Sequence, residues 1–209
     1  MAARYSAARA AEPGQDGGVT TDIETPRLRL RRFTADDEDL LVDLDGDPAV
    51  MEFLTGGKPT SRDRIRREVL PRLLGYYERW PHWGYFAGEV LDAGAFIGWF
   101  AMRPKDGYPD DVPELGYRLR RSAWGHGYAT EGSLALVDKA FGEWGAATVI
   151  AETMAVNTRS RNVMEKCGLT HVRTRHDEWD DPIPGTEHGE VEYAVTRDEW
   201  LARKARFLG

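Results

Sequence analysis

The sequence predicts an α/β fold in which a mixed sheet carries helices on both of its faces. Stretches that alternate apolar and polar residues are interleaved with stretches of helical periodicity, in the order β-α-α-β-β-β-α-β-α-β-β. The 209 residues are enough for one hydrophobic core, and 41% hydrophobic with 30% charged residues is a globular composition. We expect a single domain over residues 21–209, after a flexible tail over residues 1–20 whose "PGQDGG" stretch resembles a linker.

The first half of this domain is predicted to hold three strands and two helical regions. "RLRLRRF", Arg27–Phe33, alternates apolar and basic residues and predicts a strand. Thr34 then precedes acidic residues and an apolar run, which is typical of a capped helix start. A second helical region runs from about Ser61 to Arg79, where Pro71 should split or bend it. "YFAGEV" and "AFIGWFAM" follow as the two strands of a hairpin.

The second half alternates strands with helices. "ELGYRLR", Glu114–Arg120, predicts a strand, and a helix with regularly spaced apolar residues follows over Tyr128–Trp144. "GAATVIAETM" contains a short buried strand, and a helix over Thr158–Cys167 ends at Gly168. "LTHVRTR" and "EVEYAVT" predict two further strands, and the last thirteen residues have a helical pattern.

Composition and charge exclude several classes of function. A net charge of −7 argues against a nucleic-acid-binding protein, which needs clustered cations to replace counterions. The single cysteine, Cys167, allows no intramolecular disulfide, and its place at a helix end predicts a packed small side chain. The five histidines lack the spacing of a metal site, so we expect no metal. No apolar run approaches the ~20 residues of a membrane span, and the start lacks a secretory signal, so a cytoplasmic location without membrane contact is expected.

A glycine-containing loop lies where the strand Glu114–Arg120 gives way to a helix. It reads Trp124-Gly125-His126-Gly127-Tyr128-Ala129, followed by Thr130. The first turn of a helix leaves N–H groups without partners at its positive end, and glycine lets another molecule approach the backbone closely. Together these features favour a phosphate site, although a plain tight turn explains the same residues. The pattern is neither a Walker loop nor a dinucleotide fingerprint.

A second stretch, "NTRSRNVMEKCGL", opens another helix directly after a strand, with Asn157 at the strand end and Ser160 in the first helical turn. With both stretches the chain resembles the GNAT superfamily of N-acetyltransferases, and most of all the branch that acetylates the N-termini of ribosomal proteins. The loop is similar to that family's [Gln/Arg]-x-x-Gly-x-[Gly/Ala] acyl-CoA motif, with Trp124 at its first position. The resemblance extends over about Ile23 to Trp200. It implies a GNAT-type central sheet, mixed, mostly antiparallel and twisted, of about seven strands.

The resemblance also implies acetyl-CoA as co-substrate and a set of contacts for it. In the family, the strand matching Glu114–Arg120 diverges from the one matching Val149–Met154, and the pantetheine arm fills the gap like an added strand. Backbone groups of Tyr117 and Leu119 would contact the arm, and the side-chain amide of Asn157 would bind it. The diphosphate would lie on backbone N–H groups of the loop, which comprises Trp124, Gly125, His126, Gly127, Tyr128, Ala129 and Thr130.

Acetyl transfer to an amine requires a base, an oxyanion donor and a proton for the leaving thiolate. Glu152 and Glu114, on the two diverging strands, are the candidate bases, and each is equally explained as a solvated carboxylate at a strand end. A backbone N–H near Leu119 is the candidate oxyanion donor. Many relatives place a tyrosine acid where this chain has Met164, so Ser160 is the substitute candidate, although a polar residue in a first helical turn explains it equally. The alternatives are that water protonates the thiolate or that the thiolate leaves unassisted.

The functional hypothesis is an N-acetyltransferase that moves an acetyl group directly from acetyl-CoA to a primary amine in a ternary complex. The acceptor is a protein N-terminus or a small-molecule amine. The alternative is a non-catalytic acyl-CoA-binding module that senses the coenzyme or supports a partner, which the absence of the tyrosine keeps open. The sequence leaves the oligomeric state open, with a homodimer as one option.

Overall fold

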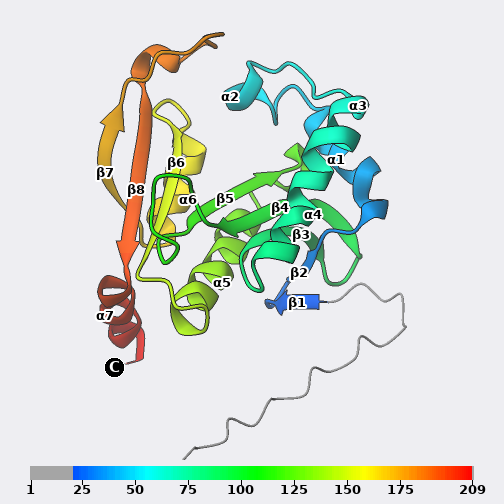
Figure 1. Cartoon of the computed structure of the whole chain (residues 1–209). Helices are drawn as coiled ribbons and strands as arrows, with labels where there is room; N and C mark the ends of the chain where they lie inside the picture. The colour runs from blue at the N-terminus through cyan, green and yellow to red at the C-terminus, as the bar shows by residue number, and fades with distance from the viewer. Residues whose placement is uncertain (1–20, 209) are drawn as a thin grey trace, which may run out of the picture.

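The computed structural model describes residues 21–208; the tail predicted over residues 1–20 lies outside this range. Its centre is an eight-stranded sheet with the order β1-β2-β3-β4-β5-β6-β8-β7 (Figure 1). The strands are β1 (Thr21–Glu24), β2 (Leu28–Arg32), β3 (Gly84–Val90), β4 (Ala95–Arg103), β5 (Glu114–Leu119), β6 (Thr148–Met154), β7 (Thr170–Arg175) and β8 (Glu190–Thr196). Only β5 and β6 pair in parallel; the other neighbours are antiparallel.

The predicted mixed, mostly antiparallel sheet is therefore confirmed, with one strand more than the seven expected. The additional strand is β1, whose four residues "TDIE" are too few for a recognisable alternation. It exists because β2 pairs with it along the edge of the sheet. Tertiary pairing thus supplies a strand that local sequence does not announce.

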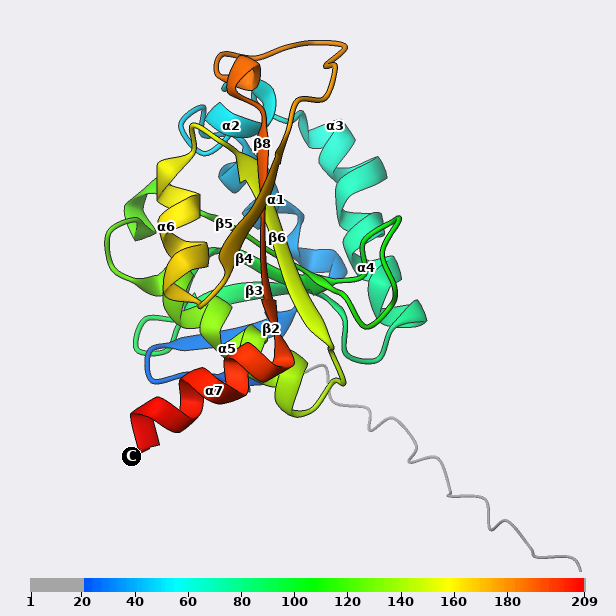
Figure 2. The same ribbon diagram turned by 90° about the vertical axis from the view of Figure 1, so that its left-hand side faces the viewer.

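Helices cover both faces of the sheet, as predicted (Figure 1, Figure 2). The helices are α1 (Glu38–Asp45), α2 (Glu52–Thr55), α3 (Arg62–Arg64), α4 (Leu70–Arg79), α5 (Tyr128–Gly142), α6 (Thr158–Lys166) and α7 (Arg197–Leu208). One core cluster joins α5 and α6 to the sheet, and a second cluster joins α1 and α4 to the opposite face. The sheet thus separates an α5/α6 side from an α1/α4 side.

The second helical region is divided next to Pro71, as the sequence predicts. α3 is followed by a wide helical turn over Ile65–Val69, in which the Leu70 N–H donates to the Ile65 carbonyl, and α4 starts at Leu70. A proline ring crowds the carbonyl four residues earlier, so a change of hydrogen-bond spacing at this point relieves the clash.

Close packing of α5 on the sheet sets the position of the loop that precedes this helix. A Cβ on Gly132 would lie only 2.5 Å from the Phe100 ring, so the absence of a side chain lets the helix backbone approach β4. Phe100 is fully buried at this contact. The first turn of α5 is therefore held close to the C-terminal end of β5.

A buried ion pair ties β2 to the start of α1. Arg31 donates to both carboxylate oxygens of Asp37 at 2.8 Å, and both residues are 6% exposed. Burial opposes the charge on Asp37, but hydrogen bonds from Arg31 and Thr34 outweigh it and lower the pKa of the carboxyl. Arg31 also donates to Glu89 at 2.7 Å.

Replacing Asp37 with asparagine is expected to destabilise the fold by about 3 kcal/mol, because it leaves Arg31 partly uncompensated in the interior. Since the pKa of Asp37 is lowered in the folded state, the stability that its charge contributes is present above the unfolded pKa of about 4 and is lost as the pH falls further. Urea unfolding at pH 7 and at pH 3 measures this: the difference in unfolding free energy between wild type and Asp37→Asn should be smaller at pH 3. Glu68→Gln, in the exposed Arg64–Glu68 pair, should cost less than about 0.5 kcal/mol.

Candidate active site

The two strands at the centre of the sheet separate almost as soon as they meet. β5 and β6 share one pairing, Glu114 with Ile150, where the Ile150 N–H donates to the Pro113 carbonyl at 3.0 Å. Their ribbons diverge beyond this point (Figure 1). Beyond this pairing the inner edges of β5 and β6 are unpaired with each other toward the C-terminal ends of both strands, and we call this unpaired stretch the gap.

Backbone groups of β5 face this gap. The Arg120 N–H donates to the Ile97 carbonyl on β4 at 2.8 Å, and the direction of hydrogen bonding alternates along a strand. The N–H and carbonyl groups of Leu119 and Tyr117 consequently point away from β4 and toward β6. The Leu119 carbonyl accepts a hydrogen bond from the Trp124 indole at 2.9 Å, which ties the glycine loop to the end of β5.

The loop before α5 has the backbone shape that its glycines suggest. Gly125 and Gly127 both have a φ of +79°, a left-handed conformation that side chains disfavour. A Cβ on Gly125 would meet nothing within 4 Å, and one on Gly127 would meet only the Arg27 guanidinium, at 3.5 Å. Gly127 directly precedes α5, so the first N–H groups of that helix are next to open space.

Arg27 holds the loop from the side of β2. Its guanidinium donates to the His126 carbonyl at 3.0 Å and to Glu131 at 2.6 Å, and it lies 4.7 Å from the centre of the Tyr128 ring. Thr25 also donates to Glu131, at 2.7 Å. No signal in the sequence links Arg27 to a loop about a hundred residues away, so sequence reasoning missed this contact.

Asn157 connects β6 to the start of α6. Its side-chain oxygen accepts from the Ser160 N–H at 3.2 Å, so it caps the helix, and its side-chain nitrogen donates to Thr153 at 3.0 Å. The exposed Arg159 guanidinium lies 4.9 Å from the Trp124 ring. The two helix starts, of α5 and α6, are thereby brought next to each other.

Tyr117 and Ser160 form a hydrogen-bonded pair between β5 and α6. The phenol donates to the Ser160 carbonyl at 2.9 Å, and the two hydroxyl oxygens are also 2.9 Å apart. Burial raises the pKa of Tyr117 well above its usual range, which keeps the phenol protonated. The sequence predicted only backbone contacts for Tyr117. Met164, one turn after Ser160, is 2% exposed and fills the core.

Glu114 and Glu152 lie on the α1/α4 side of the gap. Their strand neighbours Leu115, Val149 and Ala151 belong to the α5/α6 core, and alternation along a strand places the two glutamates on the other face. The side chains of Glu114 and Glu152 are only 12% and 11% exposed. The two carboxylates thus flank the gap from adjacent strands.

Each of these carboxylates is already paired with cations. Lys105 contacts both, with its amine 3.4 Å from Glu114 and in direct contact with Glu152. Arg103 pairs with Glu114 at 2.5 Å, and Arg175 pairs with Glu152 at 3.0 Å. Charges on this face are therefore balanced locally.

The same α1/α4 side carries further paired charges toward the open end of the gap. Arg118 contacts the buried Asp45 of α1 at 2.5 Å. A neighbouring pocket of about 470 Å³ lies between α1 and the segment after β5, and its lining includes Asp43, Asp47, Arg120 and Arg121. Arg120 and Asp43 are 3.5 Å apart, so this pocket is also lined by charges of both signs.

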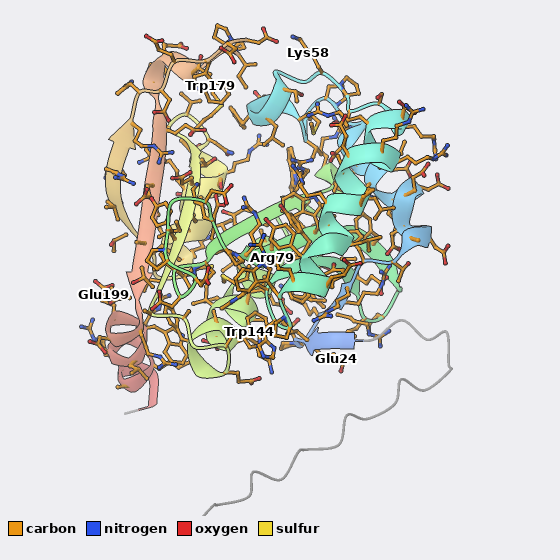
Figure 3. All side chains as sticks on the ribbon, in the orientation of Figure 1. Glu24, Lys58, Arg79, Trp144, Trp179 and Glu199 are labelled. Carbon is orange, nitrogen blue, oxygen red and sulfur yellow. The ribbon has the colours of Figure 1, made fainter. Side chains whose placement is uncertain are left out.

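Two surface segments meet near the end of β6. Lys58, after α2, pairs with Asp181 at 2.9 Å, and Figure 3 shows Lys58 and Trp179 at the same end of the molecule. A Cβ on Gly56 would lie 3.0 Å from Ile183. The segment after α2 and the β7–β8 loop therefore touch each other at this end of the molecule.

Cys167 is a packed core residue, as expected. It is 2% exposed, and burial raises the pKa of its thiol to about 12, so a reactive thiolate is not available at neutral pH.

Within residues 21–208, no cluster of histidine, cysteine and acidic side chains has the arrangement of a metal site. Over the same residues, no helix has the length and apolar character needed to cross a bilayer.

Comparison with known proteins matches residues 27–170 to the model of the acetyltransferase (GNAT) domain family. The chain is 38% identical over 185 residues to the FsC-acetyl coenzyme A-N(2)-transacetylase of Aspergillus fumigatus, covering 86% of this chain and 77% of that protein. The fold is shared with the spermidine N-acetyltransferase of Vibrio cholerae in complex with CoA and spermine (TM-score 0.69, 16% identity, 85% of this chain and 99% of that chain).

RimL, a ribosomal alpha-N-protein acetyltransferase solved in complex with coenzyme A, has the same fold (TM-score 0.70, 17% identity, 84% of this chain and 97% of that chain). These two structures are too distant in sequence to show more than the fold. The family match extends over most of the chain, and the curated relative is, by its name, an acetyl coenzyme A N(2)-transacetylase. The chain belongs to the GNAT family and is an acetyl-CoA-dependent N-acetyltransferase.

Proposed function

We propose that the enzyme transfers the acetyl group directly from acetyl-CoA to the α-amine of an acceptor, with both substrates bound in the gap between β5 and β6. The observation that supports this proposal is the gap between β5 and β6. A single pairing of the two strands closes one end of it, and backbone groups of Tyr117 and Leu119 face it. Acetyl-CoA, when bound, supplies an activated thioester. A cytoplasmic location is a further part of the proposal and depends on the sequence alone, while the oligomeric state stays open, with a homodimer as one option.

The residues near the gap fit a phosphorylated amide chain. Main-chain N–H groups from Gly125 to Thr130 would hold the diphosphate, since the space around both loop glycines is open. Tyr117 and Leu119 would offer backbone hydrogen bonds to the pantetheine. Asn157 uses one side-chain N–H on Thr153, which leaves its second N–H for a ligand.

Glu152 and Glu114 are the candidate bases, because they flank the gap on the side that α1 and α4 cover. The acceptor amine would approach from this side and pass its proton to one of the two carboxylates, directly or through a water. The Leu119 N–H, which faces the gap, would donate to the developing oxyanion.

Ser160 remains the candidate proton donor to the leaving thiolate, and Tyr117 is its positioning residue. The phenol–serine hydrogen bond fixes the hydroxyl between β5 and α6. Ser160→Ala is expected to lower kcat about 10-fold, with the KM for acetyl-CoA changing less than about 2-fold. Tyr117→Phe should give a smaller loss in kcat, and Tyr117→Ala a larger one with raised KM. Steady-state kinetics check this, and a Ser160→Ala enzyme with unchanged kcat would leave the proton to water.

An α-amine, on the carbon next to a carbonyl group, fits this acceptor side better than a polyamine. An α-amino group has a pKa of about 8, against about 10.4 for an alkylamine, so more of it is neutral at pH 7 and a weaker base suffices. Glu114 and Glu152 already have cationic partners, so their negative charge is largely neutralised and attracts a polycation only weakly. The relative that is 38% identical acts, by its name, at an N(2) position, which agrees with this choice.

The test is CoA release with a matched acceptor panel: a peptide, the same peptide with a blocked N-terminus, a small amino-acid amide, and spermidine. We expect turnover with the free peptide or the amide, at least ~10-fold above spermidine in kcat/KM. Preference for spermidine would overturn the acceptor class. Tight acetyl-CoA binding without turnover on a broad amine panel would revive a non-catalytic role, which family membership does not favour.

A further inference from the structure

One lysine amine is held beside the two candidate bases of the proposed reaction. Lys105 lies in the β4–β5 loop, and its side chain is 20% exposed, less than those of Lys58, Lys139 and Lys204, while Lys166 is an exposed residue. These five are all the lysines of the chain. Four of them lie on the outer surface, and only Lys105 reaches the gap.

The position of the Lys105 amine follows from its two partners. Glu114 is on β5 and Glu152 is on β6, so an ammonium that contacts both carboxylates spans the two strands at the point where they part. It lies on the α1/α4 side, from which an acceptor amine would approach. The chain thus places a primary amine of its own beside both candidate bases.

We propose that Lys105 is a self-acetylation site, which takes the acetyl group when no acceptor is bound. This inference depends on the proposed function of the gap. An amine tethered beside a bound thioester gains the rate advantage of an intramolecular reaction. Lys105 is held by ion pairs only, and a lysine stem has several rotatable bonds, so the amine can move toward the gap.

The step balances with acetyl-CoA as the only co-reactant, which the established activity supplies. The Lys105 ammonium first gives a proton to Glu152 or Glu114, and the neutral nitrogen attacks the thioester carbonyl. A C–N bond forms and the C–S bond breaks, with the electron pair leaving on sulfur. The nitrogen loses its second proton as the amide forms, and the thiolate takes up one proton through Ser160 or water. The products are N-acetyl-lysine, CoA and the proton that the glutamate then releases.

Acetylation would change the electrostatics of the acceptor side. It removes the cation shared by Glu114 and Glu152, which then keep only Arg103 and Arg175 as their respective partners. The site becomes more negative by one charge. Self-acetylation would therefore favour binding of more cationic acceptors.

The experiment incubates the purified full chain with isotope-labelled acetyl-CoA and no acceptor, then follows label at each lysine by peptide mass spectrometry over time. Lys139, a partly exposed surface lysine paired with Glu143, reports chemical acetylation in the same sample. We expect Lys105 to gain label at least ~10-fold faster than Lys139. Gly127→Val, which should lose coenzyme binding, is expected to remove that difference without changing the rate at Lys139.

Other outcomes separate the inference from the proposed function. If Lys105 stays unlabelled, or gains label no faster than Lys139, while the wild type releases CoA with an α-amine acceptor, self-acetylation is overturned and the proposed function stands. Equal labelling of Lys105 in wild type and Gly127→Val also overturns it, because the reaction would then be independent of the bound coenzyme. Failure of the wild type to bind acetyl-CoA, measured by calorimetry, would overturn the proposed function itself.

Discussion

Gly127→Val is expected to weaken acetyl-CoA binding by at least ~100-fold, about 2.7 kcal/mol. The φ of +79° at this position disfavours any β-branched residue, so the backbone must shift and the first N–H groups of α5 turn away from the diphosphate. The added side chain also enters the open space in which the diphosphate would lie. Isothermal titration calorimetry with acetyl-CoA measures the effect.

Gly94→Val is the matched control for this substitution. Gly94 has a φ of +60°, lies at the β3–β4 turn, and a Cβ there would meet nothing within 4 Å. It should lose a similar amount of folding stability, roughly 1–2 kcal/mol, but keep wild-type coenzyme affinity. If both variants bind acetyl-CoA like the wild type, the loop before α5 does not hold the diphosphate.

Glu152→Gln is expected to lower kcat by about 10²–10³-fold if this carboxylate is the base, with the acetyl-CoA dissociation constant nearly unchanged. Glutamine keeps the size of the side chain and its hydrogen-bonding oxygen toward Lys105, but it cannot accept a proton. The same substitution at Glu114 discriminates between the two candidates, since only the base should show the full loss. A kcat–pH profile adds a second readout, because loss of the base removes the acidic limb.

Glu190→Gln serves as the control on the same face of the sheet. Glu190 lies on β8, across from Met154 on β6, and burial together with the charge of Glu152 raises the pKa of its carboxyl. Its replacement should change kcat less than about 3-fold, because this strand does not border the gap. Should all three variants retain wild-type kcat, the acceptor amine loses its proton to solvent rather than to the protein.

Much of the fold follows from local patterns. Apart from β7, which is exposed along almost its whole length, the strands from Leu28 to Thr196 alternate or run apolar in the sequence as they do in the sheet. The division at Pro71 follows from the chemistry of one residue. The left-handed glycines of the loop and the start of α6 at Asn157 were also predictable, because helix starts and positive φ values favour few residue types.

The partners of the candidate site residues were not predictable in this way. Arg27 reaches His126, Tyr117 reaches Ser160, and Lys105 reaches Glu152, each across tens of residues and each by a side chain whose partner depends on the packed fold. A single sequence carries no pairing information for such contacts. Sequence reasoning therefore identified the candidate carboxylates but did not show that both are already charge-paired.

The single pairing between β5 and β6 has a mechanical consequence. In the described sheet, β1–β5 and β6–β8 form two halves that are joined by the single pairing of Glu114 with Ile150. A ligand that hydrogen-bonds to the inner edges of both β5 and β6 would take the place of the absent strand pairing and connect the two halves of the sheet. The same hydrogen bonds would then give the coenzyme its affinity and make the whole enzyme stiffer. The order of substrate binding would depend on which substrate forms these bonds.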